Sequence, residues 1–272
     1  MSVSDLIHPT AVIDPATILG DGVQVGPYAV IGPKCDIGPG VWIGAHAVVE
    51  YASIGEGSKI HSFAAVGTPP QDLKFKGEET RAFIGKNTVI RECATVNRGT
   101  LASGKTVVGD NCLVMAYSHI AHDCVVGNHV VMANSATLAG HVEVSDGVVM
   151  GGLCAVHQFA RLGTRAMIGG GSMVAQDVAP FCMTHGNRAW IVGLNVVGLR
   201  RAGLPKESLS ALKSVFKTFF LSDLTLEEAF SRVEGNALPP EAKLFVDFLR
   251  SSKRGFCRPK SGGRASMADS AE

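Results

Sequence analysis

The stretch VGDNCLVMAYSHIAHDCVVGNHVVMANSATLAGHVEV, residues 108–144, has an apolar residue at every sixth position. The phase continues further, so that twelve consecutive sixth positions are apolar: Val108, Val114, Ile120, Val126, Met132, Leu138, Val144, Met150, Val156, Leu162, Ile168 and Val174. In a chain that is 46% apolar, chance gives such a run roughly once in ten thousand trials. The same spacing runs from Ile7 to Val49, slips by one residue before Ile54, and resumes at Ile84.

A period of six fits neither an α-helix nor a simple alternating strand, and it predicts a parallel β-helix. Each hexad is then one short strand and a turn, with the apolar residue pointing inward and a small residue after it at the corner. Three hexads make a triangular coil of about 18 residues. About 25 hexads make roughly eight coils, in a prism about 40 Å long. We therefore expect a mainly β fold, with residues 18 apart lying above one another.

Two stretches interrupt the repeat. GTPPQDLKFKGEETRAF, residues 67–83, is too long and polar for a coil, and GTLASGK, residues 99–105, is a shorter excursion. We expect both to loop outward. Functional residues gather on such loops when a rigid scaffold positions them.

The chain divides into three regions: a β-helix at 1–190, a small helical domain at 191–257 and a disordered tail at 258–272. The tail is predicted from its small, polar residues. In the helical region Pro205 suits a helix start, Thr225 and Glu228 have capping-box spacing, and PPEAKLFVDFLR predicts a third helix. Five apolar residues share one face of the first predicted helix: Leu209, Leu212, Val215, Phe216 and Phe219.

Composition excludes several classes of function. A formal net charge of +1 gives no reason to expect nucleic acid or an anionic membrane as partner. The seven cysteines are odd in number and form no CxxC pair. With no apolar run of transmembrane length and no signal peptide in MSVSDLIHPT, we expect a cytoplasmic protein with no membrane span.

The stacking rule gathers three histidines. His141 lies 19 residues after His122, which is one coil plus one residue. His157 lies 35 residues after His122, which is two coils minus one residue. Gly140 and Gln158 lie directly above His122 in this register, and His119 lies on the same coil as His122. A neutral histidine can take a proton from an attacking hydroxyl, and a backbone N–H such as that of Gly140 can donate to an oxyanion. The neighbours Ser118 and Cys124 are not obvious nucleophiles, so direct attack is favoured over a covalent intermediate.

Other interpretations stay open on spacing alone. A histidine on a β-helix is often only solvated surface, and histidine clusters also bind zinc. Asp123 either orients a histidine ring or faces solvent. In a regular strand its side chain would point away from that of His122, whereas at a corner it can point toward it.

Several stretches resemble the UDP-N-acetylglucosamine acyltransferase family, the O-acylating enzymes that begin lipid A synthesis: QDLKF, AYSHIAHDC, LAGHV, GGLCAVHQF, VAQDV, GNRAW and GLNVVGLRRAG. The resemblance covers residues from about 6 to 255. It implies a left-handed β-helix that transfers an (R)-3-hydroxyacyl group from acyl carrier protein to the 3-hydroxyl of UDP-N-acetylglucosamine. His122 is then the general base, Asp123 assists it, and the Gly140 N–H binds the oxyanion.

The resemblance also implies the residues that bind the substrates. Those for sugar, phosphate or nucleotide are Asp72, Lys74, His119, His141, His157, Gln158, Asn195 and Arg201. Gly170 and Arg188 lie at the acyl groove, and the small Gly170 leads us to expect an acyl chain of about C12 to C14. The family is a homotrimer that needs no metal or other cofactor. Val197 and Ala202 depart from the family's acidic residue and second arginine in the nucleotide segment, and Arg200 is a possible substitute.

Three rivals remain. An N-acyltransferase of the same pathway has this fold but normally carries an extra N-terminal domain, whereas the hexads here begin at Ile7. A γ-type carbonic anhydrase shares the fold and binds zinc through histidines such as His119, His122, His141 and His157. The third rival is a solenoid scaffold without catalytic function.

Overall fold

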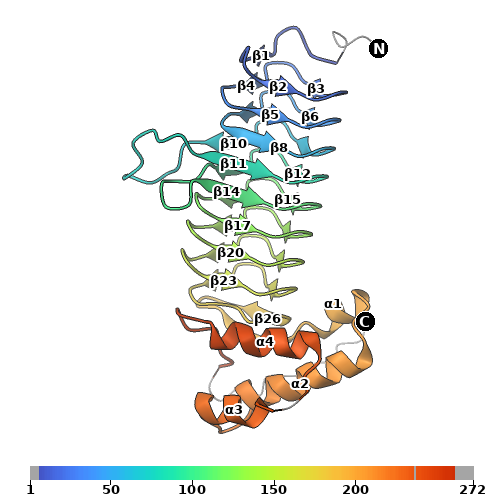
Figure 1. Cartoon of the computed structure of the whole chain (residues 1–272), viewed down its shortest axis with the longest axis vertical. Helices are drawn as coiled ribbons and strands as arrows, with labels where there is room; N and C mark the ends of the chain where they lie inside the picture. The colour runs from blue at the N-terminus through green and yellow to red at the C-terminus, as the bar shows by residue number, and fades with distance from the viewer. Residues whose placement is uncertain (1–5, 236, 261–272) are drawn as a thin grey trace.

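The computed structural model describes residues 6–235 and 237–260. The chain forms an upright triangular prism of short parallel strands, closed at its C-terminal end by helices (Figure 1). Within the described ranges the strands form three sheets, one on each face of the prism. The predicted parallel β-helix is confirmed.

Successive strands of each sheet come from successive coils. The nine-stranded sheet, sheet B, contains β1 (Val12–Ile13), β4 (Val30–Ile31), β7 (Val48–Val49), β10 (Ala65–Thr68), β13 (Thr95–Asn97), β16 (His119–Ile120), β19 (Thr137–Leu138), β22 (Ala155–Val156) and β25 (Met173–Val174). The eight-stranded sheet, sheet C, contains β2 (Ile18–Leu19), β5 (Asp36–Ile37), β8 (Ala52–Ile54), β11 (Arg81–Ile84), β14 (Lys105–Val108), β17 (Val125–Val126), β20 (Glu143–Val144) and β23 (Arg161–Leu162).

The ten-stranded sheet, sheet A, carries the chain into its C-terminal region. It contains β3 (Gln24–Val25), β6 (Trp42–Ile43), β9 (Lys59–Ile60), β12 (Val89–Ile90), β15 (Leu113–Val114), β18 (Val131–Met132), β21 (Val149–Met150), β24 (Met167–Ile168), β26 (Cys182–His185) and β27 (Trp190–Leu194). The last pair, β26 and β27, is antiparallel. Strand β27 therefore lies across the expected boundary at residue 190, in a region where the sequence suggested helix.

The coil-to-coil register follows the hexads. Ile120 pairs with Leu138, 18 residues on, while Ile37 pairs with Ile54 across the one-residue slip. Ile54 pairs with Ile84 and Ile84 with Val108, so the register holds across both interruptions. Strands β10 and β11 extend into the range 67–83, and the first excursion is therefore 69–80. The second is 99–104, because β14 already begins at Lys105.

The small residue after each inward apolar residue has a packing role. At Gly55 a Cβ atom would lie 2.6 Å from the Gly85 carbonyl carbon on the next coil. The strand-to-strand spacing of about 4.8 Å leaves no room for a larger side chain there. The corner itself depends on a different residue, which takes the left-handed backbone conformation; Asp123, with φ of 59°, is one example.

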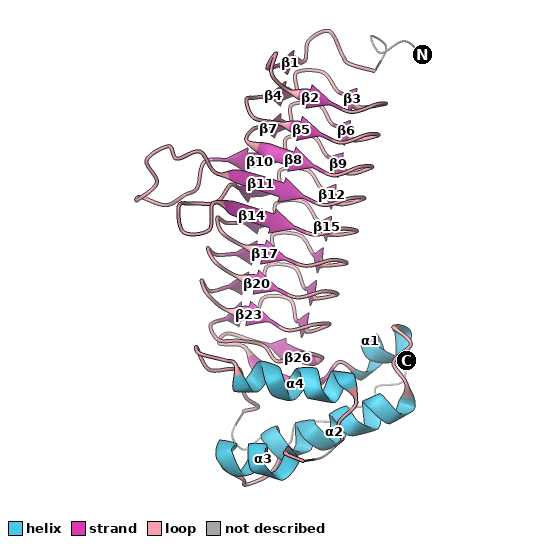
Figure 2. Ribbon diagram, in the orientation of Figure 1, coloured by secondary structure: helices cyan, strands magenta, loops and turns pink. Residues whose placement is uncertain are grey.

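The C-terminal region packs on the last coils of the prism. It contains α1 (Val196–Arg201), α2 (Lys206–Phe220), α3 (Leu226–Val233) and α4 (Pro240–Arg250). The five apolar residues predicted for one face of α2 are all buried, and the Thr225–Glu228 capping box is present. Figure 2 shows α4 directly below the prism, with α2 and α3 beyond it. None of the described helices is long and apolar enough to cross a membrane.

The start of the predicted disordered tail is ordered. The Arg258 carbonyl accepts a hydrogen bond from the Ile191 N–H, and the Lys260 ammonium lies 3.7 Å from the centre of the Trp190 ring. These contacts with β27 correct the prediction for residues 258–260, whereas 261–272 lie outside the described residues.

The inward positions hold the prism together, and one substitution tests this. Leu138 is fully buried, so Leu138→Ala should lower the free energy of unfolding by about 2–5 kcal/mol through lost burial and a cavity. Val125 is 48% exposed on β17 of sheet C, and Val125→Ala should cost less than about 0.5 kcal/mol. Urea unfolding measures both, and equal effects would contradict the inward assignment.

Candidate active site

Both excursions leave the prism at the corner between sheets B and C. The segment between β10 and β11 carries residues 69–80, and the segment between β13 and β14 carries 99–104. Figure 1 shows both projecting from the same side. The next two corners along this edge hold His122 with Asp123 and Gly140 with His141. The fold therefore brings the two loops and the predicted general base to one edge.

His122 and Asp123 form a hydrogen-bonded pair. The Nδ1 atom of His122 lies 2.7 Å from Oδ2 of Asp123. Because Asp123 has the left-handed conformation of a corner residue, its side chain turns back toward the preceding histidine. Of the two orientations left open by the sequence, Asp123 therefore takes the one that contacts the histidine ring and does not face solvent. The side chain of Asp123 is fully buried and that of His122 is 15% exposed, so the histidine keeps access to the surface.

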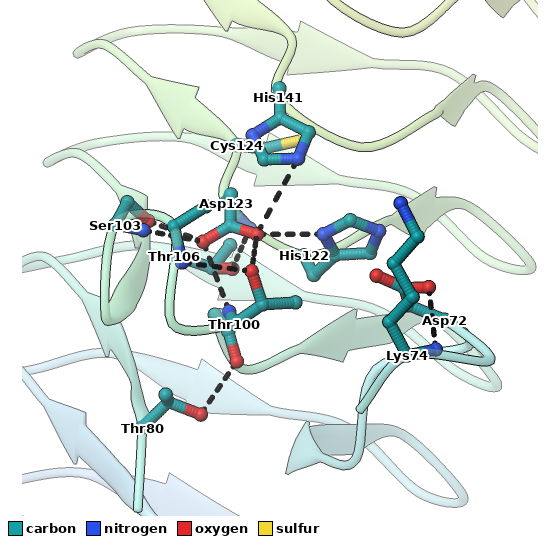
Figure 3. A network of polar contacts seen from close by, with 12 residues as sticks. Asp72, Lys74, Thr80, Thr100, Ser103, Thr106, His122, Asp123, Cys124 and His141 are labelled. Atoms are coloured by element: carbon teal, nitrogen blue, oxygen red, sulfur yellow. Dashed lines mark hydrogen bonds and ion pairs between the residues drawn. The ribbon is translucent and has the colours of Figure 1, made fainter. Parts of the chain in front are cut away.

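The second excursion holds the Asp123 carboxylate. The Thr100 hydroxyl donates to Oδ2 at 2.7 Å and the Thr100 N–H donates to Oδ1 at 3.0 Å. Ser103 donates both its N–H and its hydroxyl to Oδ1. The Asp123 N–H in turn donates to the Thr106 hydroxyl at 2.9 Å. Figure 3 shows these residues surrounding Asp123, with His122 on the open side.

These hydrogen bonds keep Asp123 ionised. Burial on its own raises the pKa of the carboxyl group, but hydrogen bonds from Ser103, His122 and Thr100 outweigh it and lower the pKa to about 2. An ionised acceptor at Nδ1 fixes the proton of a neutral His122 on that nitrogen. The Nε2 atom of His122 then carries the lone pair that can accept a proton.

Gly140 lies against the His122 ring, one coil further along. A Cβ atom at Gly140 would lie 2.6 Å from Cε1 of His122, so only glycine fits beside the ring in this position. Within the described part of the chain, no acceptor takes the Gly140 N–H. The amide is therefore available beside the predicted base.

The other histidines take different positions. The His141 ring meets His122 edge to face with centroids 5.1 Å apart, and it stacks on Phe159 at 4.5 Å. His119 lies 2.7 Å from the Thr95 hydroxyl through Nδ1. Burial, and to a smaller extent the neighbouring His122, lowers the pKa of His119, which favours its neutral form.

The predicted strip of three histidines is only partly formed. Val156 pairs with Leu138 on the preceding coil, so His157 lies over Ala139. His157 is therefore displaced sideways from the line that joins His122 and His141. Its Nδ1 atom lies 2.8 Å from Nη2 of Arg254 and 3.1 Å from the Gln158 carbonyl oxygen. The residue stacked on His141 is Phe159. Phe159 was not predicted because the hexad pattern does not show which way a corner side chain turns, and Arg254 was not predicted because it comes from the C-terminal region after α4, outside the repeat.

The first excursion carries Asp72 and Lys74. The Lys74 N–H donates to the Asp72 carboxylate at 3.0 Å, which forms a tight turn. Figure 3 shows this turn on the side of His122 that faces away from Asp123. In this view both predicted residues therefore lie toward the partly exposed side of His122.

The remaining predicted residues lie near the C-terminal end of the prism. Asn195 caps α1 by accepting from the Gly198 N–H, and Arg201 ends that helix. Gly170 lies at a corner between sheets A and B, and Arg188 lies in the turn between β26 and β27. A single chain therefore does not bring the predicted nucleotide residues to His122 (Figure 1).

The neighbouring serine and cysteine are not available as nucleophiles. Cys124 is fully buried and directs its thiol to the Ala139 carbonyl at 3.2 Å, and burial raises the pKa of the thiol to about 12. The buried Ser118 hydroxyl donates to the Ala133 carbonyl at 3.0 Å. The thiolate is the reactive form of cysteine, and the prediction of direct attack is consistent with this geometry.

The side chains of His122, Asp123 and His141 also offer donor atoms of the kind that bind metal ions. One donor atom from each lies within 4.8 Å of the others. However, the Asp123 oxygen lies 2.7 Å from His122 Nδ1 and also accepts from Thr100. Two ligands of a tetrahedral zinc ion, each about 2.0–2.1 Å from the metal, are separated by about 3.3 Å. The geometry fits a hydrogen-bonded pair better than a ligand pair.

Comparisons with known proteins identify the family. The family model described as UDP N-acetylglucosamine O-acyltransferase, domain 2, matches residues 177–257, and the bacterial transferase hexapeptide model (six repeats) matches 105–140. An acyl-[acyl-carrier-protein]–UDP-N-acetylglucosamine O-acyltransferase of Myxococcus xanthus (strain DK1622) is 51% identical over 255 residues, which are 93% of this chain and 99% of the relative. The chain belongs to the UDP-N-acetylglucosamine O-acyltransferase family.

Further relatives agree with this placement. The enzyme of the same name from Aliarcobacter butzleri (strain RM4018) is 43% identical over 252 residues, 92% of this chain and 97% of the relative. The solved UDP-N-acetylglucosamine acyltransferase of Campylobacter jejuni superimposes with a TM-score of 0.89 at 42% identity, covering 93% of this chain and all of that one. The protein is thus an O-acyltransferase with a left-handed parallel β-helix and a small helical C-terminal region, and not a member of the rival classes.

The pKa of Asp123 predicts how stability depends on pH in this O-acyltransferase. The folded-state pKa of about 2 lies below the ordinary value of 3.8. Ionised Asp123 therefore stabilises the fold above about pH 4, and this contribution, on the order of 2 kcal/mol, is lost as the pH falls toward 2. Urea unfolding of the wild type and Asp123→Asn should show a stability difference that shrinks between pH 4 and pH 2. A difference independent of pH would contradict the assignment.

Proposed function

We propose that this chain transfers an (R)-3-hydroxyacyl group from acyl carrier protein to the 3-hydroxyl of UDP-N-acetylglucosamine, the first step of lipid A synthesis. The observation that carries the proposal is the His122–Asp123 pair, in which a buried, ionised carboxylate fixes the proton of a partly exposed imidazole on Nδ1. The relatives named above carry this activity in their names.

Each group then has a defined part in the reaction. Nε2 of His122 takes the proton of the 3-hydroxyl as its oxygen attacks the thioester carbonyl carbon. The carbonyl carbon becomes tetrahedral and its oxygen an oxyanion, to which the Gly140 N–H donates. As the intermediate collapses, the carbon–sulfur bond breaks and the imidazolium returns its proton to the leaving sulfur. Asp123 stabilises the imidazolium and stays ionised throughout.

Acceptor binding is assigned to the side chains around the base. Asp72 and Lys74 hold the sugar or its phosphates from the first excursion, with His119, His141, His157 and Gln158 along the prism. A neutral His119 supplies a hydrogen bond instead of a charge. Lys74 is a cation that can pair with the diphosphate. The other cation assigned to the nucleotide, Arg201, lies further along the chain.

Nucleotide binding gives a reason for more than one chain in the assembly. Asn195 and Arg201 lie near the C-terminal end of the prism, several coils from His122. Residues of two chains would complete one site if copies of the prism packed side by side. We therefore include a homotrimer, with the sites between neighbouring chains, and a cytoplasmic location in the proposal. Ala202 caps α1 where the family has a second arginine, so Arg200 in the last turn is the nearest substitute.

His122→Ala tests the mechanism directly. Loss of the general base should lower kcat by on the order of 10²–10⁴ at saturating substrates. His129→Ala is a matched control, because His129 is an exposed corner histidine on the following edge of the same prism. Turnover of His122→Ala within a few-fold of the control, with an unchanged thermal unfolding midpoint, would remove His122 from the mechanism. One zinc ion bound per chain, and lost together with activity, would also contradict the role of His122 as the general base.

The acyl length is a separate part of the proposal. A Cβ atom at Gly170 would lie 3.3 Å from the Gly152 carbonyl oxygen, so a side chain there has little room on one side. With glycine in place we expect acyl carrier protein thioesters of about C12 to C14 to react faster than C10. Rates across a panel of chain lengths measure this, and a clear preference for C10 would contradict it.

A further inference from the structure

Arg98 is a buried arginine at the base of both excursions. Its side chain is 7% exposed, and Nη1 donates to the Glu50 carboxylate at 3.2 Å and to the Gly67 carbonyl at 3.0 Å. Its backbone N–H donates to the Thr68 carbonyl at 3.1 Å. The guanidinium thus holds the point at which the first excursion leaves the prism.

The same guanidinium contacts two aromatic rings. Its carbon lies 4.2 Å from the centre of the Tyr51 ring and 5.2 Å from the centre of the Phe75 ring. Tyr51 belongs to the prism, whereas Phe75 belongs to the excursion. Arg98 therefore joins the loop to the scaffold through the faces of two rings, an interaction that suits a planar, weakly hydrated cation better than an ammonium group.

Phe75 is tied to the residues proposed to bind the acceptor. Its N–H donates to the Asp72 carbonyl at 3.0 Å, and the Lys74 N–H donates to the Asp72 carboxylate at 3.0 Å. Residues 72–75 therefore form one compact turn. Fixing the Phe75 ring on Arg98 fixes the direction in which Asp72 and Lys74 point.

The residues that follow Arg98 continue to the catalytic pair. The Gly99 carbonyl accepts from the Thr80 hydroxyl at the end of the first excursion, at 2.6 Å. Thr100 holds the Asp123 carboxylate. One short segment, 98–100, therefore contacts the loop that carries Asp72 and Lys74 and also the carboxylate that orients His122.

We propose that Arg98, through its contact with Phe75, is a positioning residue that sets the Asp72–Lys74 turn for binding of the sugar nucleotide. The inference rests on the proposed binding role of that turn. The Phe75 contact governs acceptor binding, whereas the proton transfer at His122 does not depend on it. Loss of the contact then raises KM for UDP-N-acetylglucosamine and leaves kcat nearly unchanged.

Phe75→Leu is the most direct test, because Phe75 is only partly buried in a loop and leucine keeps an apolar side chain without a ring face. KM for UDP-N-acetylglucosamine should rise roughly three- to thirty-fold, the equivalent of one cation–π contact. We expect kcat and KM for the acyl donor to stay within two-fold. Phe83→Leu is the matched control: the Arg81 guanidinium lies 5.8 Å from the Phe83 ring, which is outside the turn.

Arg98→Lys and the double variant show whether the effect passes through this contact. Arg98→Lys should also raise KM for the sugar nucleotide, and in the Phe75→Leu background the rise should be smaller than in the wild type, because the Phe75 contact is already lost. Additive effects in folded variants would overturn the proposal, as would an unchanged KM in Phe75→Leu. Lys74→Ala separates the two levels of inference. If it leaves KM unchanged, the binding role of the turn fails; if it raises KM while Phe75→Leu does not, only the positioning role fails.

Discussion

Hydrogen bonding between successive coils is the constraint on which the rest of the structure depends. The Ala121 N–H donates to the Leu138 carbonyl and the His141 N–H donates to the His122 carbonyl, and such bonds repeat along the prism. Together with the buried inward residues they leave no room for extra residues within a strand. Additional residues have to leave at a corner. The two excursions leave at the same edge, next to the corner that holds His122 and Asp123.

The buried charges at this edge are stabilised by the excursions themselves. The Asp123 side chain is fully buried, and without Thr100 and Ser103 its carboxylate would keep His122, at 2.7 Å, and the more distant His141, at 3.8 Å, as its side-chain partners among the described residues. Burying an unpaired charge is costly, and a carboxyl group in that situation takes up a proton. The Arg98 guanidinium is likewise paired with the Glu50 carboxylate, and it also contacts the Gly67 carbonyl and the Tyr51 ring. The polar groups that orient His122 are thus also those that hold the loops against the prism.

Much of this arrangement could be predicted because the hexad converts sequence separation into position. The coils, the slip before Ile54, the capping box at Thr225 and the proximity of His122, Gly140 and His141 all followed from spacing. The direction of side chains at corners did not, because it depends on a left-handed backbone residue whose identity varies. For this reason the orientation of Asp123 stayed open and the stacking of Phe159 on His141 was missed. Strand β27 was missed because it pairs antiparallel at the end of the repeat, where the period of six no longer applies.

In the proposed mechanism the corner with His122 and Asp123 holds the acceptor hydroxyl at Nε2 of the oriented histidine. A crystal structure with UDP-N-acetylglucosamine bound tests it most directly. The account predicts the sugar 3-hydroxyl within about 3.2 Å of His122 Nε2, with Asp123 still on Nδ1 and Lys74 contacting the sugar nucleotide. A 3-hydroxyl out of reach of Nε2 with no bridging water, or a metal ion held between His122 and His141, would contradict it.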